Sequence, residues 1–221
     1  MKIKEVSEQI SAGVIESFQK HGFKYRKTNT DFIRKGDQAD HVFKMFYYKE
    51  DDGTITIKPE IIIHVHSIED VYRSVSESNE NPYLTLGNYL SEIAEYNGDE
   101  VNFRKRPIKY WLIEDENDIE YLVKIIPKYL KEDMLPYFEE NSTIKRVDEL
   151  LNKYPEKMTV HNYMYPDRVN IAIIAAKLNN NPNYEELVDI YEKNMIDAEE
   201  NSKKQFYRLK DFLATDKYQK S

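Results

Sequence analysis

The chain has 221 residues, of which 40% are hydrophobic and 33% charged, with no cysteine and a formal net charge of −8. These values are typical of one globular domain, alone or with an appendage, and the lack of cysteine excludes disulfides, thiol catalysis and cysteine metal ligands. No apolar run reaches the ~20 residues that cross a bilayer, and charges throughout the first ten residues argue against a secretory signal, so we expect a cytoplasmic protein without membrane association.

The negative charge is concentrated in the middle of the chain. Residues 67–158 carry 12 basic and 20 acidic side chains, whereas residues 1–66 carry 11 and 10, and residues 159–221 carry 9 and 10. Nucleic-acid binding depends on clustered Lys and Arg, so we expect no nucleic-acid partner. The acid surplus would favour a basic protein partner, although such a surplus also serves solubility alone.

The first element is predicted to be an amphipathic helix. Its apolar residues recur at steps of three and four, at Ile3, Val6, Ile10, Val14 and Phe18. Gly22 supplies a stop, because glycine adopts the left-handed conformation at a helix end without steric cost. Residues 23–35 then predict two short strands with a bend at residues 28–30, since Phe23 and Tyr25 alternate with basic residues.

The longest strand pattern runs from Asp40 to His66 and predicts a hairpin with its turn at Asp52-Gly53. A two-residue loop would pair positions whose numbers add up to 105, and a three-residue loop positions that add up to 104. We favour the second, because it gathers the apolar residues on one face. Pro59 cannot donate an N–H, so the second strand is at an edge or bulged there. The predicted core face consists of Phe43, Met45, Tyr47, Ile55, Ile57, Ile61, Ile63 and Val65.

Ser67, with Asp70 three residues later, predicts a capped helix that runs to about Val75. Residues 76–83 are polar and are predicted to form a loop. Residues 84–97 fit a helix or a strand about equally well, so this assignment stays open.

Residues 107–114 predict a strand that contains the single tryptophan, Trp111. A helical pattern begins at Asn117 and reaches Leu130, with a kink or break expected at Pro127 because proline removes a helical hydrogen bond.

The last eighty residues predict helices only. A short helix near residues 144–151 precedes an apolar helix from Arg168 to Leu178. After a turn, a long helix is predicted from Asn183 to about Leu213, and the last two helices form a helical hairpin. The long helix is almost wholly polar at residues 197–205, so that part is expected to project into solvent or fray.

Soft motifs in the first 150 residues carry a resemblance. They are H-G-F-K-Y-R-K at the end of the first helix, then D-F-I-R-K, the long hairpin, W-L-I before an acidic helix start, and L-P-Y-F-E-E-N-S-T. Together they resemble a bacterial family of uncharacterised small proteins known as a domain of unknown function. The resemblance implies an α+β fold with an antiparallel sheet, and it transfers no activity and no functional residue.

Two imidazoles stand out at His64 and His66, which alternation places on the same face of a strand. In the favoured register Asp40 lies across from His64. Two imidazoles and a carboxylate form a ligand set for zinc or iron, so these three residues are candidate metal ligands. The alternative is an ordinary polar face that is solvated or covered by a helix.

A dense polar and aromatic segment precedes the apolar helix and contains His161, Tyr163, Tyr165 and Arg168. Aromatic and Arg residues anchor many protein interfaces, so these four are candidate partner-binding residues. The alternative is a packed connector between subdomains.

The sequence therefore predicts an α+β fold with a mainly antiparallel four- to six-stranded sheet and helices packed on one face, in a domain of residues 1–140. A C-terminal helical extension of residues 141–221 follows. No dinucleotide loop, phosphate loop, nucleophile elbow or zinc-protease motif occurs, so no cofactor is expected and no catalytic residue is assigned.

Three functional hypotheses follow. The first is a protein-binding module, immunity-like, toward a basic partner. The second is a ligand- or metal-binding enzyme that uses an open sheet face around His64 and His66. The third is a scaffold that forms a homodimer through the C-terminal helix.

Overall fold

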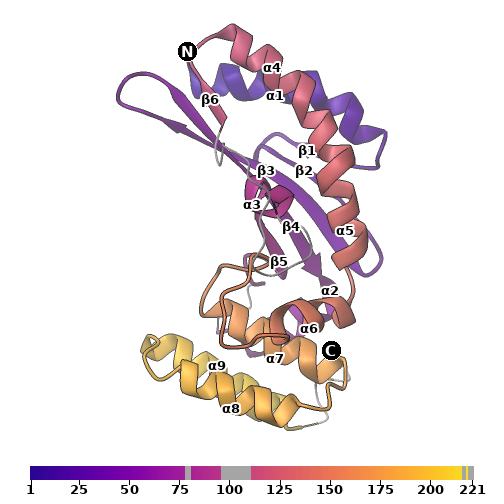
Figure 1. Cartoon of the computed structure of the whole chain (residues 1–221), viewed down its shortest axis with the longest axis vertical. Helices are drawn as coiled ribbons and strands as arrows, with labels where there is room; N and C mark the ends of the chain where they lie inside the picture. Colours follow the sequence, from indigo (N-terminus) through magenta and orange to yellow (C-terminus); the bar gives the residue numbers. More distant parts are fainter. Residues whose placement is uncertain (78–80, 96–110, 216–217, 219–221) are drawn as a thin grey trace. The chain divides into compact units, whose positions relative to one another are not determined.

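The computed structural model describes residues 1–77, 81–95, 111–215 and 218, whose elements are labelled in Figure 1. The chain divides into two compact units. Unit 1 consists of Met1–Ile62 and Gly87–Glu140, and unit 2 of Ile63–Leu86 and Asn141–Ser221. Unit 2 therefore includes a segment from the first half of the chain in addition to everything after residue 140.

A mainly antiparallel sheet confirms the predicted α+β fold. In the described part of the chain it has six strands in the order β1-β2-β3-β4-β5, with β6 also paired to β4. Strand β2 runs antiparallel to both β1 and β3, and β6 runs antiparallel to β4. The strands are β1 (Lys24–Arg26), β2 (Asp31–Arg34), β3 (Ala39–Lys49), β4 (Ile55–Val65), β5 (Leu86–Tyr89) and β6 (Trp111–Ile113).

Helices α1 (Ile3–Gln19) and α4 (Glu116–Tyr129) pack against each other in unit 1 (Figure 1). The aromatic ring of Phe18 joins α1 to the sheet, because its centroid lies 4.2 Å from that of Phe32 and 5.3 Å from that of Phe43. The two helices meet closely at Gly13, where an added Cβ would lie 2.6 Å from both methyl carbons of Val123. The core of unit 1 thus lies between these helices and one sheet face.

The hairpin turn has the predicted three-residue loop. The backbone N–H of Glu50 donates to the carbonyl of Thr54 at 2.9 Å, and Gly53 takes a φ of +92° that glycine adopts without strain. These paired positions add up to 104, as the favoured register requires. Seven of the eight residues of the predicted core face are buried, and Tyr47 near the turn is half-buried; the seven are Phe43, Met45, Ile55, Ile57, Ile61, Ile63 and Val65.

Pro59 lies between two segments of β4 that meet different strands. Ile55–Ile57 pairs with β6, and Ile61 approaches Gly87 of β5. The described pairs with β6 stop at Ile57, so the predicted edge or bulge at Pro59 stays a prediction. A Cβ on Gly87 would lie 2.2 Å from the carbonyl oxygen of Ile61, and the φ of Gly87 is +144°. Only glycine is therefore accommodated where β5 approaches β4.

Helix α2 (His66–Val75) starts earlier than predicted. Its N-cap is Val65, and no side chain caps it, so the serine cap at Ser67 is wrong. The described part of the ambiguous segment contains both structures in turn, because β5 passes directly into α3 (Leu90–Glu95). Residues 78–80 and 96–110 lie outside the described residues, and with them parts of the predicted loop and of the strand at 107–114.

Pro127 neither ends α4 nor separates it from the next helix. The helix continues to Tyr129 and passes through a π-helical turn, η1 (Leu130–Met134), into α5 (Leu135–Asn141). Of the predicted kink or break, the break is wrong and the kink stays a prediction; the departure from α-helical geometry begins three residues after the proline. A π turn often accommodates such local mismatches in a continuous helix.

Unit 2 is built around one buried helix, α7 (Asp167–Leu178), against which α2, α6, α8 and α9 pack. All nine residues from Arg168 to Ala176 are buried, which explains why its sequence shows no polar face. The surrounding helices of the C-terminal part are α6 (Ile144–Asn152), α8 (Tyr184–Asn194) and α9 (Glu200–Leu213).

The predicted long helix from Asn183 to Leu213 is wrong, because α8 and α9 are separate helices with residues 195–199 between them. Met195 is buried at this junction, which anchors the chain where its polar run begins. The apolar face of α9, formed by Phe206, Leu209 and Leu213, is fully buried within the chain. A homodimer through this helix would have to use its other face. Among the described residues, no helix has both the length and the apolar character needed to cross a bilayer.

Candidate functional site

His64 and Glu69 form a short imidazole–carboxylate pair in unit 2. His64 lies at the end of β4 and Glu69 in the first turn of α2, so the tight passage from strand to helix brings them together. The Nδ1 of His64 is 2.6 Å from an Oε1 of Glu69, and their side chains are 24% and 6% exposed. An ionised carboxylate at this distance holds a proton on Nδ1 and leaves Nε2 as the basic nitrogen.

Thr85 fixes the buried end of this pair. Its hydroxyl donates to Glu69 Oε1 at 3.1 Å and accepts from the backbone N–H of Val65 at 3.0 Å. The side-chain amide of Asn162 donates to the carbonyl of Thr85 at 3.0 Å, and its oxygen accepts from the N–H of Met164 at 2.9 Å. This chain of hydrogen bonds holds the carboxylate of Glu69 in place, and Glu69 in turn orients the imidazole of His64. Carboxylates orient histidines in the same way in many functional sites.

The three candidate metal ligands each have other surroundings. His64 pairs with Glu69, Asp40 forms an ion pair with Lys35, and His66 opens helix α2. Within the residues that the structure describes, no three His, Asp or Glu side chains are placed to hold a metal ion. The sheet face around β4 is also not open at its even-numbered positions, because Glu60 is completely buried. The structure therefore gives the metal hypothesis no support.

The segment from His161 to Arg168 is largely internal to unit 2. His161 and Arg168 are only 3% and 4% exposed, and a guanidinium nitrogen of Arg168 donates to the carbonyl of Lys157 at 2.8 Å. Burial and the charge of Arg146 lower the pKa of His161 to about 3, so its ring is neutral at physiological pH. His161 and Arg168 are therefore buried parts of a packed connecting segment, which was the alternative to a partner-binding role.

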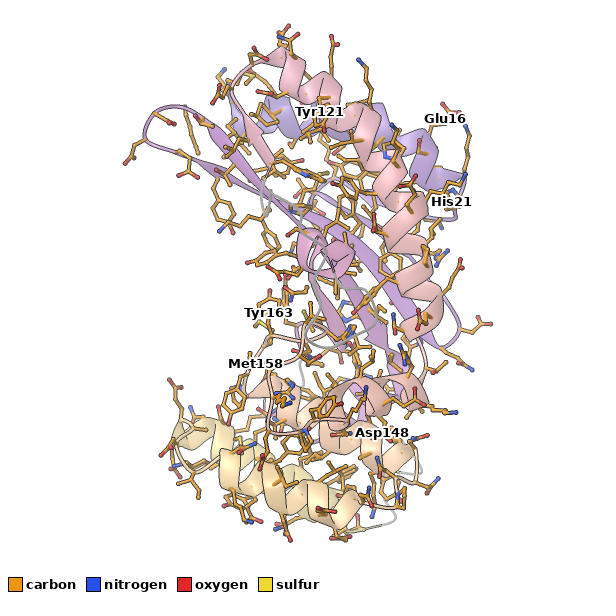
Figure 2. All side chains as sticks on the ribbon, viewed as in Figure 1. Glu16, His21, Tyr121, Asp148, Met158 and Tyr163 are labelled. Carbon is orange, nitrogen blue, oxygen red and sulfur yellow. The ribbon has the colours of Figure 1, made fainter. Side chains whose placement is uncertain are left out.

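Tyr163 and Tyr165 keep some accessible surface (Tyr163 is labelled in Figure 2). Tyr165 is 45% exposed, and its hydroxyl donates to the carbonyl of Asn194 at 2.5 Å. The peptide bond between Tyr165 and Pro166 is cis. Of the four candidate partner-binding residues, these two tyrosines are the ones that a partner could reach.

A buried carboxylate with three amide donors joins α6, α7 and the turn before α8 (Asp148 in Figure 2). Asp148 is 3% exposed and accepts from the amides of Asn152 and Asn179 at 2.6 Å and of Asn181 at 2.9 Å. Tyr191 adds a bond from its hydroxyl to Asn152 at 2.8 Å. These residues are called the Asp148 cluster below: Asp148, Asn152, Asn179, Asn181 and Tyr191. Both carboxylate oxygens of Asp148 accept hydrogen bonds from these amides, so the role of the cluster is structural.

A surface groove in unit 1 lies between the second half of α1 and strand β1. It has a volume of about 470 Å³, and we call it the α1–β1 groove. Gly22, with φ at +82°, reverses the chain between the two elements, and the N–H of Phe23 returns to the carbonyl of Phe18 at 3.1 Å. The residues lining the groove are Ile15, Gln19, Gly22, Phe23, Lys24 and Tyr25.

One wall of the α1–β1 groove is the end strand of the sheet. Strand β1 pairs with β2 and has no second strand partner in the described part of the chain. The ring of Tyr25 packs at a tilt against Phe32, at 5.0 Å between centroids, so it faces the side of the sheet that α1 covers. The groove thus combines an apolar floor with an unpaired strand edge.

Neither Glu69 with Thr85 nor the α1–β1 groove was identifiable as a site in the sequence. The pairing of His64 with Glu69 depends on where α2 begins, and the Ser67 cap pattern assigned that turn differently. The groove forms where α1 and β1 pack together, and the sequence predicts each of these elements but not their packing. No family model, no curated protein and no solved structure matches this chain. The resemblance to a family of unknown function accordingly stays a prediction.

Proposed function

We propose that this chain is a cytoplasmic protein-binding module that takes an extended segment of its partner into the α1–β1 groove. The observation that carries the proposal is the edge of β1, which has no second strand partner among the described residues, beside an apolar hollow of about 470 Å³. An edge strand presents unpaired N–H and C=O groups, which a second chain pairs with by adding a strand. The hollow beside it would then receive side chains of that segment.

Several features of the groove support this mode of binding. Ile15 and Tyr25 are half-buried and leave apolar surface at the groove, and Gln19 is an exposed side chain at its rim. Strand β1 has three residues, which spans about 10 Å and matches three to four residues of a ligand. Backbone pairing would supply affinity, and the hollow would select the side chains that alternate toward it.

The proposal is tested by selecting extended peptides on the protein from a displayed random library. The variant Gln19→Trp places a bulky ring in the groove, and Gln9→Trp puts the same ring at an exposed position of α1 outside it. Selected peptides should lose binding to the first variant and keep it with the second. In NMR titrations their amide shifts should centre on residues 15–25. Enriched peptides that bind both variants equally would refute the groove as the site.

A basic partner, as an immunity-like role requires, would use a different surface. The acid surplus lies in residues 67–158, whereas the α1–β1 groove lies in the first 25 residues. A competition experiment separates the two, since a basic protein bound at the acidic region would not displace a peptide from the groove.

A second candidate function is proton transfer by His64. The observation that favours it is the 2.6 Å contact from Nδ1 to the buried Glu69, which orients the ring and leaves Nε2 on its other side. A panel of carboxylic and phosphoric ester substrates tests it. Hydrolysis that is abolished in His64→Gln and unchanged in His66→Gln would support this function, and equal rates in both variants would refute it.

A further inference from the structure

The segment around the α1–β1 groove is basic, whereas the whole chain is acidic, and Lys24 is the cation among the six residues that line the groove. Residues 17–30 carry four basic side chains and no acidic one, although the net charge of the protein is −8. The four are Lys20 at the end of α1, Lys24 and Arg26 on β1, and Lys27 just after it. Arg34 adds a fifth cation beneath the groove, with its guanidinium 5.2 Å from the ring centroid of Phe23.

Carboxylates of the protein itself compensate only part of this charge. Lys20 pairs with Glu16 at 2.8 Å and Lys27 with Glu8 at 2.8 Å, and these side chains are between 43% and 81% exposed. Exposed pairs of this kind contribute little and exchange readily with another carboxylate. Glu16 and His21 are labelled in Figure 2 at the end of α1 that precedes β1.

The two cations on β1 itself are held differently. Arg26 is fixed by Asp31 through two bonds, from Nε at 2.7 Å and from a terminal nitrogen at 2.6 Å. Lys24 is exposed, and the structure gives it no ion pair among the described residues. Lys24 is therefore the cation of the groove that is open to a ligand carboxylate.

The alternation of β1 determines which ligand side chain meets which residue. Tyr25 pairs with Phe32 and lies on the covered side of the sheet, whereas Lys24 and Arg26 lie on the opposite side. A strand added beside β1 would alternate in the same way. Its apolar residues would enter the groove beside Tyr25, and the residues between them would stand next to Lys24 and Arg26.

We propose that the α1–β1 groove recognises an extended segment of a partner protein in which acidic and apolar residues alternate, and that Lys24 selects for the acid. This rests on the proposed function and adds the chemistry of the occupant. A basic segment would place like charges side by side with Lys24 and Arg26. A second copy of this chain that paired through β1 would also place like charges side by side, because each of the two β1 strands carries two cations, Lys24 and Arg26.

Three synthetic peptides test the proposal on the full chain. They share one alternating frame with apolar residues at every second position, and the positions between hold Glu, Gln or Lys. Affinities are measured by fluorescence anisotropy at low and high salt. The Glu peptide should bind about tenfold tighter than the Gln peptide, and the Lys peptide more weakly still. High salt should reduce this difference, because it screens exposed charges.

Two protein variants identify the residue responsible. Lys24→Glu should lower the affinity for the Glu peptide about tenfold or more and raise that for the Lys peptide. Lys4→Glu makes the same charge change at an exposed position of α1 away from the groove, and it should leave the order of the peptides unchanged. A Glu peptide that is N-methylated at the amides facing β1 should not bind, whereas methylation at the alternate amides should be tolerated.

The outcomes separate this inference from the proposed function. Equal affinity for the Glu and Gln peptides, unchanged by Lys24→Glu, would overturn the acidic specificity and leave groove binding intact. Absence of any shift in the amides of residues 15–25 with all three peptides would overturn both. Sedimentation that shows a dimer of the free protein, dissociated by Gln19→Trp, would identify a second copy of the chain as the occupant and overturn the proposal.

Discussion

Lowering the pH from 7 to 5 is expected to destabilise unit 2 through His161. The folded chain holds the pKa of this imidazole at about 3, because the ring is buried and Arg146 is a nearby positive charge. In the unfolded chain the pKa returns to roughly 6.5. At a pH above the pKa of the unfolded chain, the lowered histidine pKa does not change the free energy of unfolding. As the pH falls below that pKa, the free energy of unfolding decreases, because only the unfolded chain takes up the proton.

The magnitude follows from proton uptake by the unfolded state alone. Between pH 7 and pH 5 an unfolded histidine passes from mostly neutral to mostly charged, which stabilises that state by about 2 kcal/mol. The folded ring stays neutral over the same range, because its pKa is about 3. His161 should thus reduce the free energy of unfolding by about 2 kcal/mol over this interval.

Urea denaturation followed by far-UV circular dichroism at pH 7, 6 and 5 measures the effect. His161→Gln should be less stable than the wild type at pH 7, but its loss between pH 7 and 5 should be smaller by about 2 kcal/mol. His41 in unit 1, whose pKa burial lowers to about 4, contributes its own loss in both proteins and cancels in the comparison. The exposed His21→Gln serves as the control. An equal pH dependence of His161→Gln and wild type would refute the reasoning.

Three further substitutions have expected outcomes that denaturant unfolding checks. Gly87→Ala should reduce stability by roughly 3 kcal/mol or prevent folding, because the added methyl would lie 2.2 Å from the carbonyl oxygen of Ile61. Gly13→Ala should cost about 1–3 kcal/mol through its contact with Val123, and combining it with Val123→Ala should cost less than the two changes added together. Asp148→Ala should cost about 2–4 kcal/mol, because it leaves the buried amides of the Asp148 cluster without their acceptor.

Matched control substitutions distinguish the steric and hydrogen-bonding effects from a general loss of stability on any substitution of glycine or aspartate. Gly53→Ala meets no atom within 4 Å, although its φ is also positive, so it should cost only about 1 kcal/mol of conformational strain. Asp211→Ala removes an exposed carboxylate from α9 and should change stability by less than about 0.5 kcal/mol. Equal losses for Gly53→Ala and Gly87→Ala, or for the two aspartate variants, would contradict the steric and hydrogen-bonding explanations.

Elements with a strong period were predictable because their own residues determine which face is buried. The spacing from Ile3 to Phe18 and the alternation through β3 and β4 each predicted the face that the structure buries. The turn at Gly53 was predictable for the same local reason, since a one-residue shift would have split the apolar set between the two faces of the hairpin. These features need no knowledge of the neighbouring elements.

The failures occur where a distant partner decides the outcome. Helix α8 ends at Asn194 next to Met195, which is buried in unit 2, and sequence alone does not reveal this burial. The chain through Pro127 stays helical because packing on both sides outweighs one lost hydrogen bond. Glu69 pairs with His64 because α2 begins at His66, and the α1–β1 groove exists only once two elements meet. Local propensity carries none of this information.

The division of the chain has a consequence for its synthesis. Helix α2 is complete at Val75, yet the helix α7 on which it packs begins at Asp167. At ~5–20 residues per second a ribosome needs roughly 5–20 s to make the intervening chain. During this interval α2 lacks α7 and α9, the two helices against which it packs, so this part of a growing chain would be exposed to chaperones and to aggregation. Packing of α2 in unit 2 therefore requires a helix, α7, that is synthesised well after α2 itself.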